Sequence, residues 1–516
     1  MKKSEIFNLN LLLGISLIIS FYACGGKQDF PINENIIFQQ VYVPVIQGKT
    51  TTIAKLEIKT EQQEMLNGLE IELQGDIDFT SLSINLLLED GTIESLQGTF
   101  NKEEKSWSLT EEKSLPTGKL AMNINVDLAE NADLQGRFSL QVPMIEISGE
   151  KVQPSGQQEN LAYRIGKSLR TEGDDGVAAF RIPGLATSTK GTLLAVYDVR
   201  HDDSSDLQGN IDVGLSRSED GGNTWNPMQI IMDMGEWGNL PEDQNGIGDP
   251  SILVDPVNGD IYVVALWLHG KPGTAAWRSS EPGLTPDKTG QLMIVKSEDD
   301  GKTWTAPSNI TQPMKDASWQ LFFNGPGKGI AMKDGTLVFA AQYKDLDQIP
   351  HSTIIYSKDH GVSWQVGTGA RSKTTEAQVV ELSDGQLMLN MRDDRGGSRA
   401  VYTTVDMGNS WNEHSSNRGA LIEPICMASL IRFNSEYLLF SNPASTEGRY
   451  NITVKASDDE GITWPEKYQV LLDDQKGWGY SCMTKINEGE IGILYESSQA
   501  HMTFQILPIN EIISYE

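Results

Sequence analysis

Residues whose side chains can do chemistry stand at the ends of short apolar runs in the second part of the chain. Arginine suits an anionic ligand, because its guanidinium group stays charged at any working pH and binds a carboxylate through two parallel hydrogen bonds. Arginines and carboxylates gathered in an apolar setting need partners or a ligand. The residues at the beginnings of runs are Arg181, Asp249, Glu376 and Tyr480; those at the ends of the following runs are Arg200, Gln342, Arg392 and Glu496; Asp206 and Arg449 come shortly after such ends.

Six pairs of strands must position these residues. In each pair an apolar strand follows a turn signal and is preceded by another short strand. With a third strand, a tryptophan-containing corner and a fourth strand, each pair completes a four-stranded blade, so the sequence predicts an all-β, six-bladed β-propeller. First strands are expected at 180–187, 250–255, 329–332, 377–382, 425–433 and 481–486, and second strands at 191–197, 259–267, 335–342, 385–392, 436–440 and 489–496.

The corner is an octet of the form Ser-x-Asp-x-Gly-x-Thr-Trp. It occurs at 218–225, 297–304, 357–364 and 457–464, and with an initial Thr at 404–411, so five of the 11 tryptophans hold its last position. The Asp can accept turn amides, the Gly supplies a positive φ and the Trp anchors the turn on the sheet, which makes the octet a structural element. A missing sixth octet predicts that the last blade combines strands from both ends of the domain.

The alternation of strand direction predicts where the chemistry lies. If the first strand of each blade runs from one face to the other, the second strand returns. The starts of first strands, the ends of second strands and the loops after them then share one mouth around the propeller axis. The tryptophan corners fall on the opposite face, so the ionisable residues converge at one end of the domain.

Composition limits the partners. Lys and Arg number 41 and Asp and Glu 71, so the net charge is 41 − 71 = −30. Such a surface repels phosphate backbones and argues against nucleic-acid binding, while an anionic small molecule would require a local pocket of arginines. Three cysteines in 516 residues exclude a disulfide scaffold. Cys426 and Cys482 either pair or remain separate buried thiols.

The part before the propeller divides into further segments. Alternating runs such as 52–58 and 69–73 predict a small β-sandwich at 28–150, and polar composition predicts a linker at 151–160, with the propeller at 161–516. The sandwich carries no readable chemical constellation. An accessory sugar-binding module and a spacer both fit it.

The first residues have the pattern of an export signal. Lys2 and Lys3 precede an apolar stretch at 6–23, and Cys24 follows it directly, as in a bacterial lipoprotein whose cysteine is acylated. We therefore expect a signal peptide at 1–24 of lipoprotein type, and an exported protein in the periplasm or at the outer membrane or cell surface. The membrane would be contacted only through this lipid anchor. Plain secretion is the alternative.

Several motifs together resemble the bacterial sialidase (exo-α-neuraminidase) family. They are Phe180-Arg181-Ile182-Pro183, the five Asp boxes, the segment 376–382 and Gly479-Tyr480-Ser481, and the match extends from about Tyr163 to the end. The resemblance implies a propeller that cleaves terminal sialic acid from glycans, glycoproteins or glycolipids with retention of configuration. It implies no metal and no cofactor.

The same resemblance assigns catalytic roles. Tyr480 is expected as nucleophile, Glu376 as its general base and Asp206 as general acid and then base. The use of tyrosine has a physical reason, because a neutral phenol avoids the repulsion between a carboxylate nucleophile and the substrate carboxylate on the anomeric carbon. Asp202, Asp203 and Asp212 are rivals of Asp206.

Binding residues follow from the resemblance as well. Arg181, Arg392 and Arg449 are expected to form a fork around the carboxylate of sialic acid. Arg200 and Asp249 would face the C4 side of the sugar, and Glu496 would orient Arg181 from behind. Trp267 or Phe322 are candidates for an apolar wall around the N-acetyl group.

Other activities use related machinery. Trans-sialidases and intramolecular trans-sialidases share these residues, so hydrolysis is favoured only by its frequency in the family. A non-catalytic sialic-acid-binding propeller, a lectin, would need the arginines but not Tyr480, Glu376 and Asp206 together. The retention of all three favours an enzyme. Linkage preference and oligomeric state stay open.

Overall fold

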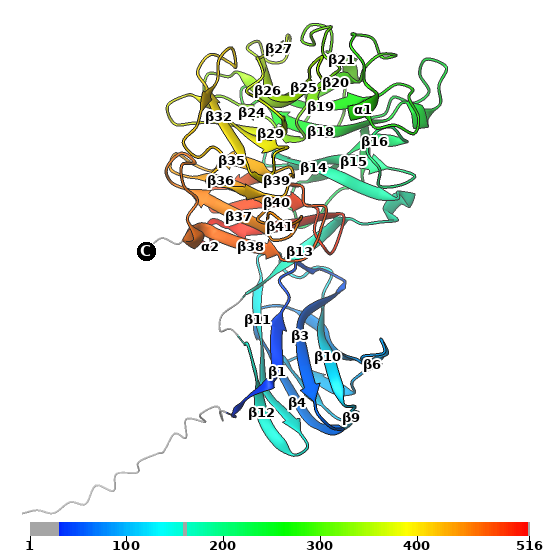
Figure 1. The fold of residues 1–516 in the computed structure, drawn as a ribbon, viewed down its shortest axis with the longest axis vertical. Helices are drawn as coiled ribbons and strands as arrows, with labels where there is room; N and C mark the ends of the chain where they lie inside the picture. Colours follow the sequence, from blue (N-terminus) through cyan, green and yellow to red (C-terminus); the bar gives the residue numbers. More distant parts are fainter. Residues whose placement is uncertain (1–29, 158–161, 514–516) are drawn as a thin grey trace, which may run out of the picture.

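A broad β-propeller rests on a narrower β domain, as the computed structural model shows (Figure 1). The structure describes residues 30–157 and 162–513. The expected signal peptide and Cys24 therefore lie outside the described residues. Among the described residues, no helix is both long and apolar enough to cross a membrane.

Five blades of the propeller are contiguous in sequence. Within residues 162–513 each pairs its strands in chain order, with antiparallel neighbours. They are β14 (Ala179–Thr187), β15 (Leu193–Arg200), β16 (Ile211–Ser218) and β17 (Gln229–Met232); β18 (Ile247–Val254), β19 (Ile261–Trp267), β20 (Gln291–Ser297) and β21 (Ser308–Asn309); β22 (Leu321–Asn324), β25 (Leu337–Lys344), β26 (Pro350–Ser357) and β27 (Gln365–Val366); β29 (Thr374–Glu381), β30 (Leu387–Asp393), β32 (Ala400–Thr404) and β33 (Asn412–Glu413); and β35 (Ser429–Arg432), β36 (Leu438–Pro443), β37 (Ile452–Ser457) and β38 (Gln469–Asp473).

The minor elements of the propeller domain are short. Within the described ranges they are the strands β23 (Gly327–Lys328), β24 (Ile330–Ala331), β28 (Arg371–Ser372), β31 (Gly397–Ser398) and β34 (Ile422–Glu423), the helices α1 (Ala276–Ser279) and α2 (Ile509–Ile512), and the 3-10 turns Asp174–Gly176, Glu242–Gln244 and Glu466–Tyr468. The described chain is thus dominated by strands. The predicted all-β class is confirmed.

The sixth blade closes the ring with strands from both ends of the domain. Its strands β39 (Ser481–Asn487), β40 (Glu490–Tyr495) and β41 (Met502–Pro508) are consecutive, and β13 (Tyr163–Arg170) pairs with β41 in antiparallel register. The closure explains the missing octet, because the third and fourth strands of this blade are not joined by a turn. The predicted six-bladed propeller is confirmed in the described residues.

The first strand of the third blade begins well before its predicted start. In the third blade the expected strand at 329–332 is only the second piece, β24, while β22 pairs with the far end of β25. The interruption is the sequence Gly-Pro-Gly-Lys-Gly at 325–329, where Pro326 lacks an N–H group and Gly327 has a φ of 99°. At this break β23 pairs with β18 of the neighbouring blade instead.

The octets form the corners that the sequence predicts. In the second copy, the Asp299 carboxylate accepts hydrogen bonds from the backbone N–H of Thr303 (2.8 Å) and from its hydroxyl (2.7 Å). These bonds to Thr303 lower the pKa of Asp299 to about 2. Trp304 donates from Nε1 to the carbonyl of Gly301 at 3.2 Å, which fixes the ring against its own turn.

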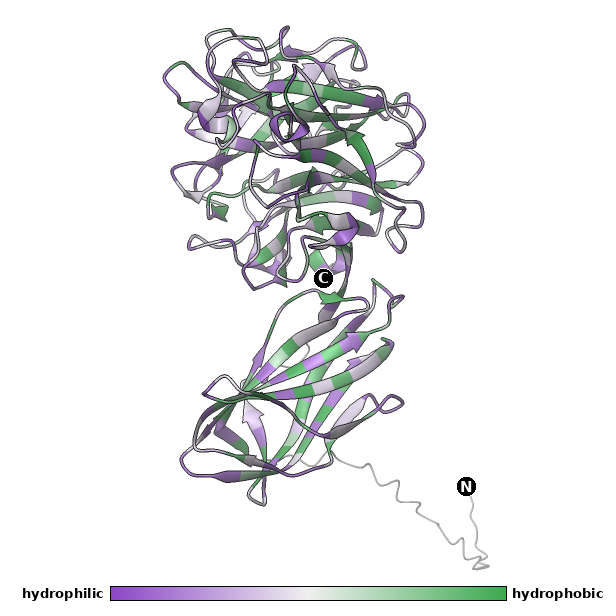
Figure 2. Cartoon of the chain, turned by 90° about the vertical axis from the view of Figure 1, so that its right-hand side faces the viewer, coloured by the Kyte–Doolittle hydropathy of each residue, from purple (hydrophilic) through white to green (hydrophobic). Residues whose placement is uncertain are grey.

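The first domain consists of two layers of strands that share one core and are joined at one edge, where β12 pairs with β1. One contains β1 (Ile32–Gln40), β3 (Thr50–Thr60), β10 (Gly118–Leu128), β5 (Phe79–Leu87) and β6 (Ile93–Ser95); the other contains β12 (Glu150–Ser155), β11 (Arg137–Ile147), β4 (Glu64–Gly75), β8 (Ser106–Leu109), β9 (Lys113–Leu115) and β7 (Gly98–Asn101), with β2 (Val45–Ile46) near β13. Hydrophobic and polar residues alternate along these strands (Figure 2). Ile58 of β3 and Ile71 of β4 belong to the same buried cluster.

The predicted linker is partly wrong. Residues 151–155 of the expected linker belong to β12, which pairs with β11 on one side and with β1 on the other. The segment is polar overall and was therefore predicted to be a linker. Its side chains nevertheless alternate as in a strand, because Val152 and Pro154 are buried while their neighbours are more exposed. The first domain therefore includes these residues instead of ending at 150.

The two domains are joined through the closing strand of the propeller. Residues Arg137 and Phe138 of β11 pair with Arg164 and Tyr163 of β13. The Tyr163 hydroxyl donates to the carbonyl of Ile53 at 2.6 Å. β13 is also the fourth strand of the sixth blade. The first domain therefore contacts the strand that closes the ring.

Candidate active site

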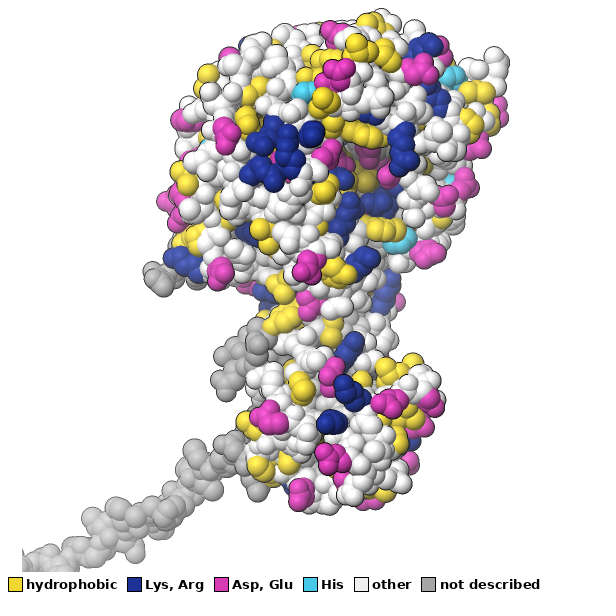
Figure 3. All heavy atoms as spheres, viewed as in Figure 1, with side chains coloured by type: hydrophobic (Ala, Val, Ile, Leu, Met, Phe, Trp, Pro, Cys, Tyr) yellow, Lys and Arg dark blue, Asp and Glu magenta, His cyan; other side chains and the backbone are white. Residues whose placement is uncertain are grey.

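The ends of the inner strands meet at one mouth of the propeller, as expected. A cavity of about 250 Å³ opens there and is lined by Asp206, Asp249, Glu376, Arg392 and Tyr480 among others. Figure 3 shows acidic, basic and apolar side chains around a hollow on this face of the propeller. The structure thus brings together residues from the first, second, fourth and sixth blades.

Tyr480, Glu376 and Arg392 form a hydrogen-bonded cluster. The Tyr480 hydroxyl donates a short hydrogen bond to Glu376 Oε1. Arg392 Nη1 lies 2.6 Å from Glu376 Oε2 and 3.1 Å from the Tyr480 hydroxyl. Burial and the nearby Glu376 charge raise the pKa of Tyr480 well above its ordinary value, while Arg392 and Arg449 oppose the shift. The phenol therefore keeps its proton until a base removes it, and Glu376 is in contact to do so.

Glu496 connects the first blade to the last. Its fully buried carboxylate accepts from Arg181 Nε at 2.7 Å and from the backbone N–H groups of Ile182 and Tyr480 at 3.0 Å each. Ile182 has a φ of 63°, which is costly for a β-branched residue and is held here by its bond to the carboxylate. Glu496 thus fixes the position of Tyr480 as well as that of Arg181.

The three arginines expected to bind a carboxylate surround Tyr480. The guanidinium carbons of Arg181 and Arg449 lie 5.7 and 5.5 Å from the centre of the Tyr480 ring. Burial would lower the pKa of Arg181, but the Glu496 carboxylate outweighs it and the net shift is upward. Arg392 Nε is buried without a hydrogen-bond partner among the described residues. A ligand carboxylate in the cavity would supply one.

Trp478 supports two of these arginines and was not singled out from the sequence. Its ring lies under Arg181, with 4.5 Å between the guanidinium carbon and the ring centre. Its carbonyl accepts from Arg449 Nη1 at 2.7 Å. The only sequence signal is an aromatic residue between two glycines immediately before Tyr480.

Arg200 joins Asp206 to a second residue that the sequence analysis missed, Asp198. Arg200 donates from Nε (3.1 Å) and Nη2 (2.8 Å) to Asp198 Oδ2, and its Nη1 lies 2.9 Å from Asp206 Oδ1. The other Asp198 oxygen accepts the backbone N–H of Asp249 at 2.8 Å. Asp198 precedes Arg200 by two residues on β15, so both side chains share one face of the strand.

Burial changes the acidity of this network. It raises the pKa of Asp198 to about 6, although the Arg200 charge opposes the shift. Burial and the charge of Asp198 raise the pKa of Asp249 well above its ordinary value. The shift stabilises the neutral form of Asp249 relative to that of an ordinary aspartate, and a neutral carboxyl group can donate a hydrogen bond. Asp206 differs from both, because 77% of its side chain is exposed.

The rivals of Asp206 are engaged elsewhere or lie outside the cavity wall. Asp203 accepts the backbone N–H of Ser205 at 2.6 Å, and Asp212 lies 2.9 Å from His201. Asp202 is exposed. Asp206 lines the cavity and contacts Arg200, so it has the position that the proposed acid requires.

The apolar side of the cavity uses different aromatic residues from those predicted. Trp277 and Phe323 line it, together with Leu207. Trp267 and Phe322 are buried in clusters between blades instead. Successive residues of a strand point to opposite faces, so Phe323 faces the cavity because Phe322 faces the core.

The cysteines do not pair. Cys426 and Cys482 are both buried and free. Cys426 packs with Ile182 and Tyr480 beneath the cavity, and burial raises its pKa to about 12. It therefore acts as a small apolar residue there.

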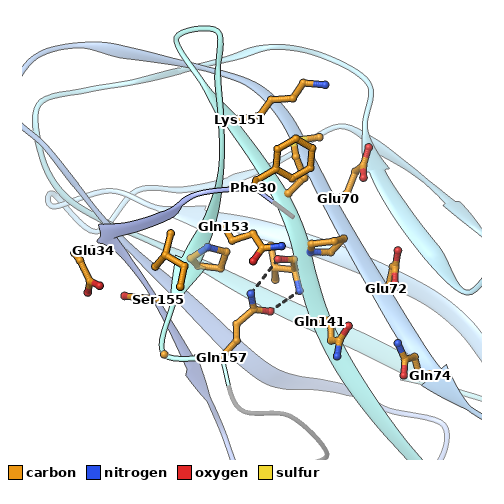
Figure 4. A pocket seen from close by; sticks show the side chains of 16 residues that line it. Phe30, Glu34, Glu70, Glu72, Gln74, Gln141, Lys151, Gln153, Ser155 and Gln157 are labelled. Carbon is orange, nitrogen blue, oxygen red and sulfur yellow. Dashed lines mark hydrogen bonds between the residues drawn. The ribbon is translucent and has the colours of Figure 1, made fainter. Parts of the chain in front are cut away.

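The first domain has a separate hollow of about 1100 Å³. Figure 4 shows Gln157 pointing across it, where its amide accepts from the N–H of Val142 (2.8 Å) and donates to the carbonyl of Val142 (3.1 Å). None of the residues that line the propeller cavity contributes to it. Whether this domain binds a sugar or is a spacer stays a prediction.

The chain is similar to known proteins over most of its length. The model of the BNR repeat-like domain family matches residues 182–496. The sialidase of Bacteroides fragilis (strain YCH46) is 51% identical over 398 residues, which is 76% of this chain and 73% of that protein. The sialidase of Micromonospora viridifaciens is 32% identical over 371 residues, covering 69% and 55%.

A solved structure is similar over nearly the whole chain. The Hadza microbial sialidase Hz136 has a TM-score of 0.83 and 40% identity, covering 92% of this chain and 100% of that one. The chain belongs to the BNR-repeat sialidases. It is an exo-α-sialidase, a glycoside hydrolase acting on sialylated glycans.

The Asp198 network generates a prediction. Asp198→Asn keeps the size of the side chain but removes the charge that holds Arg200, so kcat/KM should fall by about tenfold to a hundredfold. The loss should be larger for sialyllactose than for an aryl sialoside, whose leaving group needs less help from Asp206. Steady-state kinetics on both substrates measure it.

Asp203→Asn is the matched control, in the loop that follows β15. Its carboxylate is exposed, is hydrogen-bonded to Ser205, and is affected by the Arg200 charge only as the smallest cause of its lowered pKa, so its kinetics should stay within about twofold of the parent. Unchanged kinetics in Asp198→Asn, with both variants folded, would show that Arg200 and Asp206 do not depend on Asp198.

Proposed function

We propose that the chain hydrolyses the α-ketosidic bond of terminal sialic acid with retention of configuration, through a covalent intermediate on Tyr480. The observation that carries the proposal is the short hydrogen bond from the Tyr480 hydroxyl to Glu376, with Arg392 in contact with both. The arrangement pairs a nucleophile with its base and adds a third group that orients them.

In the first step the Tyr480 oxygen attacks the anomeric carbon while Glu376 accepts the phenol proton. The bond to the leaving oxygen breaks, and Asp206 gives that oxygen its proton. In the second step Asp206 takes a proton from the attacking water, the bond to Tyr480 breaks, and Glu376 returns the proton to the phenolate. Two inversions at the carbon give net retention.

Tyrosine suits a substrate that carries its own carboxylate beside the reacting carbon. A neutral phenol approaches this carbon without charge repulsion, and deprotonation by Glu376 supplies the nucleophile only as the bond forms. Arg181, Arg392 and Arg449 would hold the substrate carboxylate by charge-assisted hydrogen bonds. The buried donor Arg392 Nε, which has no partner among the described residues, supports this role.

Hydrolysis requires water to reach the acid and base. Asp206 is the most exposed of the proposed catalytic side chains, with 77% of its side chain accessible. It is therefore reachable by the leaving glycan in the first step and by water in the second.

The stereochemistry of the first-formed product tests the mechanism. We expect α-sialic acid to accumulate first and to mutarotate afterwards, because the two displacements restore the original configuration. Proton NMR during early turnover of an aryl sialoside distinguishes the anomers. β-Sialic acid as the first product would refute the double displacement.

We also propose that residues 1–24 direct export and that Cys24 carries a lipid anchor, which would place the enzyme in the periplasm or at the outer membrane or cell surface. The basic residues Lys2 and Lys3, the apolar stretch at 6–23 and the position of Cys24 directly after it support this. A periplasmic or surface location would bring the enzyme to extracellular sialylated glycans.

Fractionation of cells that express the full chain tests the anchor. The parent should sediment with membranes, and Cys24→Ser should be recovered mainly in the soluble fraction. Cys426→Ser is the control, because it removes a buried thiol that is far from the leader in sequence. Equal recovery of the parent and Cys24→Ser in the soluble fraction would exclude the lipid anchor.

A further inference from the structure

A cluster of cations lies at one end of the fourth blade in a protein whose net charge is −30. We name it the basic rim and define it as Arg371, Lys373, Arg395 and Arg418. Figure 3 shows Lys and Arg side chains gathered beside the hollow, over the part of the propeller where Figure 1 labels β29 and β32. None of these four residues has a role in the mechanism above.

Strand register places the basic rim at the mouth. Thr374 pairs with Asp393, so the residues just before β29 adjoin those just after β30. Asp394 lines the cavity, and its backbone N–H donates to the carbonyl of Lys373 at 3.0 Å. The cavity therefore extends from Asp206 on one side to the edge of the basic rim on the other.

The positive charge of the rim exceeds the negative charge that it contacts. Fully buried Asp393 lies 3.0 Å from Arg395 Nη1, 2.5 Å from Arg418 Nη1 and 3.8 Å from Arg371 Nε. One carboxylate thus forms ion pairs with three guanidinium groups, and the three arginine side chains are 20–34% exposed. Lys373 is exposed, and its ammonium group has no ion pair among the described residues.

The guanidinium groups are fixed in place. Arg395 Nη1 donates to the carbonyl of Ser372 at 2.9 Å, and Arg418 Nη2 donates to the carbonyl of Gly396 at 3.0 Å. Asp393 itself is anchored by its backbone N–H, which donates to buried Glu423 at 2.8 Å. A ligand would therefore meet positive charges that lose little freedom on binding.

We infer that the basic rim binds a second negative charge on the aglycone, the part of the substrate that leaves. The inference rests on the proposed function, in which terminal sialic acid occupies the cavity and the aglycone projects through the mouth. The shared chemistry is an anionic group near the scissile bond. It is either the carboxylate of a neighbouring sialic acid or a sulfate ester on the adjoining sugar, and both suit guanidinium and ammonium groups.

The test compares substrates that differ in aglycone charge. The double variant Lys373→Gln/Arg395→Gln of the full chain should lose about threefold to thirtyfold in kcat/KM for an α2,8-linked disialyl glycan, a size set by two partly exposed charge contacts. Its kcat/KM for sialyllactose and for an aryl sialoside, whose aglycones are neutral, should stay within about twofold. Higher ionic strength should lower the kcat/KM of the parent enzyme for the disialyl glycan more than its kcat/KM for sialyllactose.

Lys302→Gln/Lys358→Gln is the matched control. It also removes two positive charges, but from exposed positions in the octets. The octets lie at the opposite face of the propeller. This control should affect all substrates equally and by less than about twofold, because distant exposed charges are screened. A difference between the two double variants therefore reports the position of the charge and not the net charge.

A sulfated sialyl-lactosamine distinguishes the two anions. Loss with the disialyl glycan alone assigns the rim to a carboxylate, loss with the sulfated glycan alone assigns it to a sulfate, and loss with both shows general recognition of an anion. An equal loss on neutral and anionic aglycones, or no loss beyond the control, would overturn the inference. Failure of the catalytic proposal would be separate, since it would show as a β-configured first product in the parent enzyme.

Discussion

The carboxylate of Glu496 has no solvent around it, so every one of its interactions must come from the protein. It obtains them from the Arg181 side chain and from the backbone of Ile182 and Tyr480, which belong to opposite ends of the propeller chain. The contacts that join the first and last blades therefore also position the nucleophile. The positive φ of Ile182 is a local cost that this carboxylate offsets.

The site on the two sides of Glu496 differs in charge. Around Tyr480, arginines dominate, and they provide local positive charge for an anionic sugar in a protein of net charge −30. Around Arg200, buried carboxyl groups dominate, and burial shifts the pKa of Asp198 and Asp249 upward. Exposed Asp206 stands apart from both, where the leaving oxygen and water can reach it.

Much of this arrangement could be predicted because its signals are local and repeated. The octets and apolar strand pairs recur often enough to define the blades, and strand alternation then places Arg181, Glu376, Arg392 and Tyr480 at one mouth. The mispredicted features depend on single positions or on distant partners. The Gly-Pro-Gly sequence interrupts the first strand of the third blade, so this strand begins earlier than predicted. Phe323 lines the cavity instead of Phe322 because adjacent residues of a strand face opposite sides.

Asp198 and Trp478 show the limit of sequence reasoning most clearly. Asp198 matters because it accepts the backbone N–H of Asp249 from the next blade, a contact that no local pattern encodes. Trp478 matters because Arg181, almost three hundred positions away, lies over its ring. Contacts between segments so far apart in the sequence can be identified only in the folded propeller.

The central claim is that Tyr480, and no carboxylate, attacks the anomeric carbon. A 3-fluorosialyl fluoride should trap the intermediate, because the fluorine slows both steps while the good leaving group lets the first proceed. Peptide mapping by mass spectrometry of the inactivated enzyme should then place the added sialyl group on Tyr480, and Tyr480→Phe should give no adduct. An adduct on Glu376 or Asp206 would contradict the account.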